Sequence, residues 1–396
     1  MSCKFFSSRT ALAISLCIAF FGALAAAQTS VVYVESNKAE HNSIFAYGSH
    51  GGTLSFLGEF PTGGKGVFDL SLKLGPFDSD QEVITNAEGT VLYAVNSGSD
   101  TIAAFKIAKD GTLSPISGSP FSSGGTNPVS VGIARDTLAV VNKSMDPARP
   151  NLNQPNYASF ALAADGTVES GPLSTHLAPI GSSPSQAGIS SGRRLVFDAQ
   201  FLGGHFQSFL LDHDGSLIPE DFKTAPDTSA GPQPLGLWTH PARPILYAGL
   251  TSSSKLAVYT FDSTGHLTFI RSVPNSGKAI CWIRSNANGT RLYTVNTGDN
   301  SISVYDTTAP LFPVEIQHLI LKGVGSAFQI TPDPREGYLY VVTQRAAPSI
   351  PLGQGNTLHV LTVDKLTGKV SDTSFVNLPV PQGTRPQGVA AVELTN

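Results

Sequence analysis

The stretch Leu92-Tyr93-Ala94-Val95-Asn96-Ser97-Gly98 returns later in the chain as Leu292-Tyr293-Thr294-Val295-Asn296-Thr297-Gly298. Weaker copies of its Leu-Tyr core occur at Val32-Tyr33, Leu138-Ala139, Leu195-Val196, Leu246-Tyr247 and Leu339-Tyr340. The seven copies lie 46 to 60 residues apart. A repeat of this length indicates a chain built from similar units that pack against one another.

Each copy is followed by an alternating strand and, in most units, by a tight turn such as Asp110-Gly111 or Asp165-Gly166. Asp-Gly between two alternating strands predicts a hairpin, because glycine tolerates the positive φ that the turn requires. Three or four short strands per unit predict an all-β, seven-bladed β-propeller. Gln387 to Leu394 resembles an innermost strand without partners, so we expect it to complete the N-terminal blade and close the ring.

The N-terminus has the features of a secretory signal peptide. Lys4 and Arg9 precede an apolar run, and Ala25-Ala26-Ala27 offers a cleavage site, so we expect residues 1–27 to be removed. Residues 28–396 would form one propeller domain, periplasmic or secreted, with Cys281 as its only cysteine. The net charge of −4 gives no reason to expect nucleic acid or a membrane as partner, and we expect a monomer.

Blades that combine Leu-Tyr-Val-x-Asn with an Asp-Gly hairpin resemble those of the lactonase-type seven-bladed propellers, which include 6-phosphogluconolactonase-like proteins and carboxymuconate cyclase relatives. The resemblance covers nearly all of residues 28–396. It implies lactone hydrolysis or formation at the mouth of the central channel, with a small-molecule lactone or carbohydrate as partner. Members usually carry Pro-His-x-His in an innermost strand near mid-chain. The corresponding stretch here is Pro184-Ser185-Gln186-Ala187.

Alignment of the seven innermost strands gives one column of residues expected to face the channel. Its members are Glu82, Ser130, Gln186, Gly236, Trp282, Gln329 and Gly388. Amides and hydroxyls bind sugar hydroxyl groups, and an indole offers an apolar face for stacking, so Ser130, Gln186, Trp282 and Gln329 are candidate substrate-binding residues. The alternative is that these residues are merely the polar wall of a water-filled channel.

A second alignment places a carboxylate at Glu35 and Asp198, where five sister blades have Val or Gly. A carboxylate at a buried position needs a partner or a proton. His205 is a candidate partner of Asp198, and the pair could act as a general base that activates water. The alternatives are a structural hydrogen bond from Asp198 to a loop amide, and a His205 that merely begins a strand.

Arg385 and Lys278 fall in loops at the same mouth as Glu82. In a lactone hydrolase, Arg385 would polarise the carbonyl or hold a substrate carboxylate, and Glu82 would act as the base. Lys278 would contribute to substrate binding. The sequence requires no cofactor, although Glu82 with amide oxygens would suit a divalent cation at the channel mouth.

Two loops at this mouth are long, Lys143 to Asn156 and Gln344 to Asn356. Long loops often carry function, although simple tolerance of insertions is the alternative. Two functional hypotheses follow. The first is an exported lactonase-like propeller that hydrolyses a sugar-derived or related lactone. The second is a non-catalytic propeller that binds a glycan, a cell-wall component or a protein.

Overall fold

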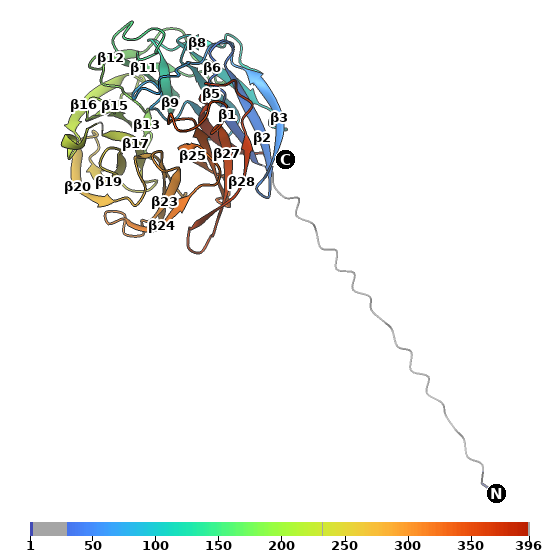
Figure 1. Ribbon diagram of the computed structural model, residues 1–396. Coiled ribbons are helices and arrows are strands. Elements are labelled where there is room, and N and C mark those ends of the chain that lie inside the picture. Colours follow the sequence, from blue (N-terminus) through green and yellow to red (C-terminus); the bar gives the residue numbers. More distant parts are fainter. Residues whose placement is uncertain (3–29, 232, 395–396) are drawn as a thin grey trace.

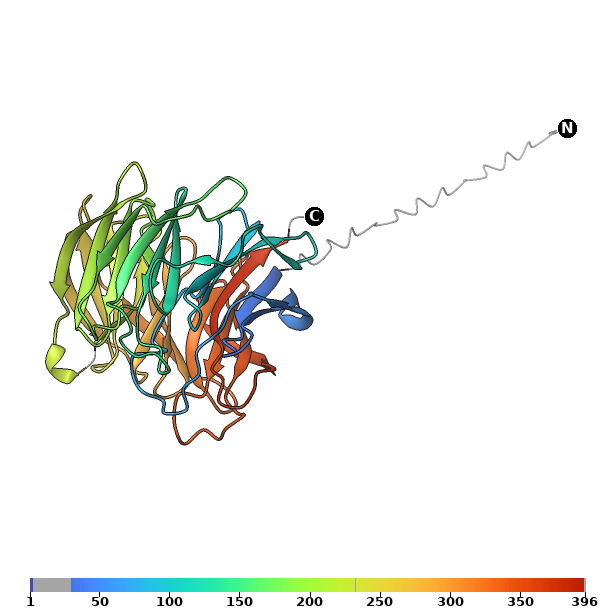
Figure 2. The same cartoon turned by 90° about the horizontal axis from the view of Figure 1, so that it is seen from above.

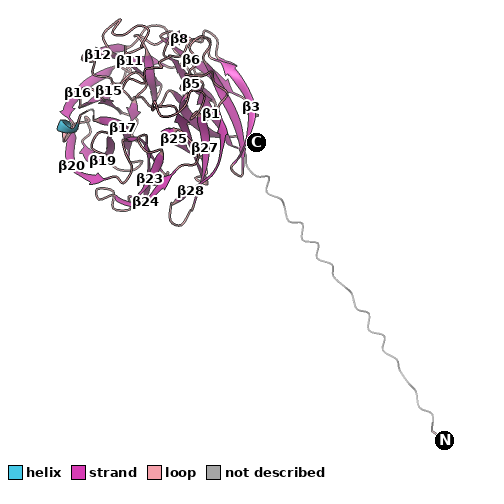
Figure 3. Cartoon of the chain, viewed as in Figure 1, coloured by secondary structure: helices cyan, strands magenta, loops and turns pink. Residues whose placement is uncertain are grey.

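The computed structural model describes residues 1–2, 30–231 and 233–394, and nearly all regular structure in this part is β-strand (Figure 3). Its strands form seven sheets that surround a central axis (Figure 1). The 3-10 turn Thr228–Ala230 is the one helical element among these residues. The predicted all-β, seven-bladed propeller is confirmed, whereas the predicted signal peptide, residues 1–27, lies almost wholly outside the described residues.

We number the blades along the chain, from the first one whose strands are all consecutive. Blade 1 holds β4 (Val83–Thr85), β5 (Val91–Asn96), β6 (Thr101–Ile107), β7 (Leu113–Pro115) and β8 (Phe121–Ser122). Blade 2 holds β9 (Pro128–Ala134), β10 (Thr137–Asn142), β11 (Asn156–Ala161) and β12 (Ser174–Leu177). Blade 3 holds β13 (Gly188–Ile189), β14 (Leu195–Gln200), β15 (His205–Leu211) and β16 (Leu217–Thr224).

The second half of the ring repeats this arrangement. Blade 4 holds β17 (Pro234–Thr239), β18 (Ile245–Leu250), β19 (Lys255–Phe261) and β20 (Leu267–Pro274). Blade 5 holds β21 (Ile280–Ser285), β22 (Arg291–Asn296), β23 (Ser301–Asp306) and β24 (Val314–Ile320). Blade 6 holds β25 (Ser326–Pro332), β26 (Tyr338–Gln344), β27 (Thr357–Val363) and β28 (Val370–Asn377).

Blade 7 joins the two ends of the chain. Its innermost strand is β29 (Gln387–Glu393), which pairs antiparallel with β1 (Ser30–Glu35). The blade continues outward with β2 (Ser43–His50) and β3 (Thr53–Pro61). The predicted closure by the C-terminal strand is therefore confirmed. Closure removes the exposed edge that an open ring of sheets would leave.

The repeated Leu-Tyr and Asp-Gly motifs meet at the boundaries between blades. The Tyr33 hydroxyl of blade 7 donates a hydrogen bond to the Gly111 carbonyl of blade 1, at 2.9 Å. Tyr93 of blade 1 donates to the Gly166 carbonyl of blade 2 in the same way, at 2.7 Å. Gly111 and Gly166 have φ of 84° and 89°, the left-handed geometry that favours glycine. At these two boundaries, the two motifs therefore belong together, because the tyrosine of one blade binds the Asp-Gly turn of the next.

Apolar side chains fill the spaces between neighbouring blades. One cluster joins Val31 and Tyr33 of blade 7 to Leu92 and Phe105 of blade 1, all at most 1% exposed.

The molecule has the shape of a thick disc. In the view turned by 90°, the sheets lie side by side across this disc (Figure 2). We call the end of the axis where the chain enters each innermost strand the upper mouth, and the opposite end the lower mouth. No helix among the described residues is long and apolar enough to cross a membrane.

Candidate functional site

A long connection closes the upper mouth. Residues 62–82 join β3 to β4, and residues 75–82, which we call the crossing segment, contact blades 2, 5, 6 and 7 from inside the ring. Gln329 of blade 6 donates a hydrogen bond to the Ser79 carbonyl at 2.9 Å. Gln387 of blade 7 donates to the Phe77 carbonyl at 2.8 Å. Residues 75–79 are thus bound mainly by side chains from several blades, whereas Asp80 and Gln81 also make backbone hydrogen bonds, with the Ser185 carbonyl at 3.2 Å and the Val131 N–H at 3.1 Å.

Two buried cations fix the crossing segment on its other sides. Lys143, which follows β10 in blade 2, donates from Nζ to the carbonyl oxygens of Gly75, at 2.7 Å, and Asp78. Arg284 on β21 in blade 5 forms a two-pronged ion pair with Asp80, at 2.6 and 3.0 Å. Both members of this pair are less than 10% exposed. A buried pair of this kind is costly to break, because either partner alone would leave an uncompensated charge.

Glu82, the predicted base, lies at the end of the crossing segment and is fully buried. Its carboxylate accepts a hydrogen bond from the Ser79 hydroxyl at 2.8 Å. Both its oxygens lie 2.9 Å from the Gln329 amide nitrogen. Burial, and then the charge of Asp80, raises the pKa of Glu82 to about 8. A carboxyl group with this pKa can both accept and return a proton near neutral pH.

Lys143 is a second buried group whose proton affinity is shifted. Its side chain is fully buried, and burial lowers its pKa to about 8, against the opposing effect of Asp78, Asp198 and Glu82. Its hydrogen bonds go to carbonyl groups rather than to a carboxylate. The ammonium therefore stabilises the crossing segment and contributes positive charge beside three carboxylates.

Asp198 is buried on β14, and the structure does not pair it with His205. Its carboxylate accepts hydrogen bonds from the Tyr157 hydroxyl at 2.6 Å and from the backbone N–H groups of Ser185 and Gln186, at 2.8 and 2.9 Å. His205 instead stacks on Phe222, with 4.4 Å between ring centroids. The structure therefore shows the alternative, in which loop amide N–H groups donate structural hydrogen bonds to Asp198. Burial raises the pKa of Asp198 to about 6.

Glu35, the other carboxylate singled out in the Leu-Tyr strands, lies in the same buried region. One of its oxygens accepts a hydrogen bond from the Asn42 amide at 2.6 Å, and the other has no partner among the described residues. Burial, and then the charge of Glu82, raises the pKa of Glu35 well above its ordinary value. A protonated Glu35 avoids a second unpaired negative charge beside Glu82.

The two predicted cations of the upper mouth differ in position. Arg385 is 5% exposed, stacks on the Phe77 ring at 4.2 Å and donates from Nε to Gln344 at 2.6 Å. No carboxylate among the described residues forms an ion pair with it. Burial lowers the pKa of Arg385 to about 10. Lys278 is exposed in the loop before β21.

The other residues of the predicted column are also buried. Ser130 accepts a hydrogen bond from the Ala187 N–H of the next blade at 2.9 Å. Gln186 accepts from the Leu237 N–H at 2.8 Å and donates to its carbonyl at 3.1 Å. Trp282 is fully buried, and its indole N–H has no partner among the described residues. In this closed arrangement, Ser130 and Gln186 join neighbouring blades rather than face open solvent.

Comparison with solved structures identifies the type of propeller. The chain superposes on a Lactobacillus plantarum protein (TM-score 0.70, 19% identity) and on the periplasmic gluconolactonase of Pseudomonas aeruginosa (TM-score 0.69, 15% identity). A candidate 6-phosphogluconolactonase of Bacteroides uniformis also matches (TM-score 0.69, 14% identity). These comparisons cover 92%, 93% and 92% of this chain, respectively, and 100% of each of the other chains. The chain has the fold of the lactonase-type propellers. Its sequence matches no family model and no curated protein.

In this propeller, the surroundings of Glu82 do not fit a metal ion. A divalent cation needs several oxygen ligands. The amide of Gln329 presents its nitrogen to Glu82, because its oxygen accepts a hydrogen bond from the Gly388 N–H at 2.8 Å. The described residues contain no group of three or more His, Cys, Asp or Glu side chains placed to hold a metal.

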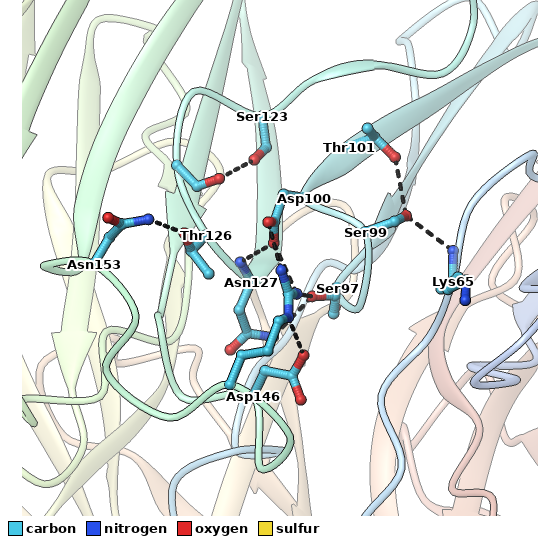
Figure 4. Close-up of polar contacts among 12 residues, drawn as sticks. Lys65, Ser97, Ser99, Asp100, Thr101, Ser123, Thr126, Asn127, Asp146 and Asn153 are labelled. Atoms are coloured by element: carbon cyan, nitrogen blue, oxygen red, sulfur yellow. Dashed lines mark hydrogen bonds and ion pairs between the residues drawn. The ribbon is translucent and has the colours of Figure 1, made fainter.

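The two long loops of the propeller are held by specific contacts. In the loop after β10, Arg149 forms ion pairs with Asp100 at 2.7 Å and Asp146 at 2.9 Å. Figure 4 shows both carboxylates within the polar contacts of this region, together with Asn127. In the loop after β26, Arg345 donates from Nε to the Ile350 carbonyl at 2.7 Å. Both loops are therefore ordered parts of the upper mouth.

The crossing segment and the role of Lys143 were not predicted from the sequence. The signal for the first was the interval from Tyr33 to Tyr93, which at 60 residues is the longest between successive copies of the repeat. The signal for the second was a cation directly after the second strand of its blade, where the repeat of β5 has Ser97. Neither signal alone shows that Lys143 contacts the crossing segment, because that contact depends on closure of the ring.

Proposed function

We propose that this propeller is an exported lactone hydrolase that acts on a sugar-derived or related lactone at the upper mouth. The observation that carries the proposal is the buried Glu82 carboxyl, whose pKa burial raises to about 8, at the end of the same segment whose Phe77 ring stacks on Arg385. Support for the substrate class comes from the fold, which this chain shares with a gluconolactonase. Support for export comes from the N-terminal sequence and from the periplasmic location of that protein.

The chemistry assigned to the site needs one base and one cation. The Glu82 carboxylate removes a proton from water as the water oxygen attacks the lactone carbonyl carbon. The Arg385 guanidinium donates hydrogen bonds to the carbonyl oxygen as it gains negative charge. Glu82 then returns the proton to the ring oxygen as the carbon–oxygen bond breaks. The product is a hydroxy acid, and Glu82 ends the cycle as a carboxylate.

Access to Glu82 requires the crossing segment to move. Residues 75–79 are held mainly by side-chain hydrogen bonds, so they would open at a lower free-energy cost than the sheets, while the buried Asp80–Arg284 pair stays in place. Substrate would enter beneath residues 75–79 and replace the contact between Phe77 and Arg385. Closure over the substrate would then exclude bulk water and strengthen the electrostatic contacts of the reacting group.

The test is hydrolysis of a panel of aldonolactones and aromatic lactones, followed by acid release at constant pH, with and without chelator. We expect turnover of at least one lactone above the spontaneous rate and loss of that turnover in Glu82→Gln. Glu88→Gln is the matched control, because Glu88 is exposed in the same blade. Absence of turnover on every lactone, or full activity of Glu82→Gln, would overturn the proposal.

A second candidate function is supported by exposed apolar side chains on the same connection. Phe68, Leu70 and Leu74 are 44%, 50% and 60% exposed. Neighbouring apolar side chains exposed on one surface often mark a binding surface. The second candidate is a non-catalytic propeller that binds a glycan, a cell-wall component or a protein here. Replacing all three residues by Ser should then abolish ligand capture without changing any lactone turnover.

A further inference from the structure

A cavity of about 250 Å³ opens at the lower mouth, on the opposite side of the crossing segment from the candidate active site. We call it the lower vestibule. Its walls come from blades 1 to 4 and include the polar or aromatic residues Gln81, Thr85, Gln186, Arg193, Trp238 and Thr239. Its volume is below that of most pockets for drug-sized ligands, which indicates a ligand the size of one sugar ring.

The inner end of the lower vestibule is a pair of amides. Gln186 donates a hydrogen bond to the Gln81 side-chain oxygen at 2.8 Å, and its remaining polar atoms are bound to Leu237. Gln81 has a φ of 65°, an uncommon conformation for a residue with a side chain. Its own amide nitrogen makes only a long contact of 3.4 Å with the Val131 carbonyl. Gln81 therefore retains a donor that a ligand in the cavity can use.

One wall of the vestibule is an indole ring whose orientation is fixed. The Trp238 N–H donates to the Ser285 hydroxyl at 2.8 Å. The Arg284 guanidinium lies 4.9 Å from the ring centroid and is itself held by Asp80. A fixed indole beside amide and hydroxyl groups provides both the apolar face and the hydrogen bonds that a sugar ring needs.

The rim of the vestibule carries an available positive charge. Arg193 is exposed in the turn between β13 and β14, and its φ of 51° sets the direction of this turn. Its guanidinium forms no ion pair with a described residue. No Asp or Glu is among the described residues that line the cavity. A guanidinium without a competing carboxylate favours an anionic group on the ligand.

We propose that the lower vestibule binds a cyclic sugar acid, a pyranose with one carboxylate. The ring would lie against Trp238, its hydroxyls would meet Gln81 and Thr85, and its carboxylate would meet Arg193. This site is separate from the upper mouth, so the inference does not depend on lactone hydrolysis. It adds to the molecule a small-ligand site on the face opposite the proposed catalytic centre.

The experiment measures binding of D-glucuronate and D-galacturonate, with D-glucose as the neutral control. The chain has two tryptophans, and Trp282 is fully buried, so a change in Trp238 fluorescence reports on the vestibule. Arg193→Ala should raise the Kd of the sugar acid about tenfold and leave lactone turnover unchanged. Arg194→Ala, a neighbouring exposed arginine outside the cavity, should leave both unchanged.

Calorimetry of the same titrations gives a readout that does not depend on fluorescence, and Trp238→Phe should remove the fluorescence change. Saturable binding of a sugar acid that weakens in Arg193→Ala supports the site. Three outcomes would overturn it: no saturable binding of either sugar acid, equal affinity for glucose, or equal loss in Arg193→Ala and Arg194→Ala. Binding that persists in Glu82→Gln, whether or not that variant hydrolyses lactones, separates this test from that of the proposed function.

Discussion

The amide of Gln329 in blade 6 bonds to Glu82 in blade 1, although 247 positions separate them and blade 7 stands between. The contact is made across Gly388, whose N–H donates to the Gln329 oxygen at 2.8 Å. A Cβ at position 388 would lie 3.0 Å from the Glu82 Cβ and 2.9 Å from the Val83 backbone nitrogen. Glycine at this position therefore allows the closing strand to bring the two side chains together.

Gly388→Ala should disturb both stability and the site. The φ of Gly388 is 69°, and the added Cβ meets backbone that cannot yield easily. We expect a loss of about 1–3 kcal/mol in the free energy of unfolding, measured by denaturant titration. Gly192→Ala is the control, because a Cβ there meets nothing within 4 Å. Equal stability of the two variants would contradict the role of Gly388.

Glu82→Gln should lose lactone turnover, by about 10²–10⁴-fold, while keeping the fold. Burial raises the pKa of Glu82 to about 8, from an ordinary value of 4.5. Between these two pH values, the folded state keeps a proton on Glu82 that the unfolded state has released. Stability of the wild type should therefore decrease as pH rises from about 4.5 to 8, and this slope should be reduced in Glu82→Gln. Melting temperatures across this range check the expectation. A parallel pH profile in both proteins would count against the buried acid.

Turnover itself should increase with pH and level off near pH 8, because only the ionised Glu82 accepts a proton from water. The measurement is kcat/KM across pH 5 to 9.5, after subtraction of the spontaneous hydrolysis that lactones undergo in base. A rate that is independent of pH below 8 would exclude Glu82 as the base.

Lys143→Met should loosen the crossing segment while leaving the blades intact. The substitution removes the hydrogen bonds to Gly75 and Asp78. We expect faster hydrogen exchange in residues 70–80 and unchanged exchange in the strands, measured by mass spectrometry. Burial lowers the pKa of Lys143 to about 8, so the folded state releases its proton before the unfolded state does. The resulting gain in wild-type stability between pH 8 and 10.5 should disappear in Lys143→Met.

Asp198→Ala and His205→Ala should behave differently, since the structure does not pair these residues. Asp198 accepts three hydrogen bonds, two of them from backbone groups that would be left unsatisfied, so we expect a loss of about 3 kcal/mol in stability. His205→Ala should change stability by less than about 1 kcal/mol and leave turnover unchanged, because the ring only stacks on Phe222. An equal loss of turnover from both substitutions, at unchanged stability, would restore the hypothesis of a catalytic pair.

The candidate site was only partly predictable. Aligning the innermost strands placed Glu82, Ser130, Gln186 and Gln329 at equivalent positions, and the structure brings Glu82 and Gln329 into contact. The alignment could not show that Ser130 and Gln186 are used between blades, since that depends on how close neighbouring strands approach. Nor could it show that Asp80, reaching from the crossing segment, meets Arg284 in blade 5.

The sequence by itself determined the architecture. Local patterns such as Leu92-Tyr93 and Asp110-Gly111 act within one blade, and their repetition sets the number of blades. The C-terminal strand, left without partners, determined how the ring closes. Only the tertiary structure decided what occupies the central channel. Residues 75–82 have no repeat or periodicity, and their position follows from contacts with Lys143, Arg284 and Gln329, which lie far apart along the chain and become neighbours only when the ring has closed.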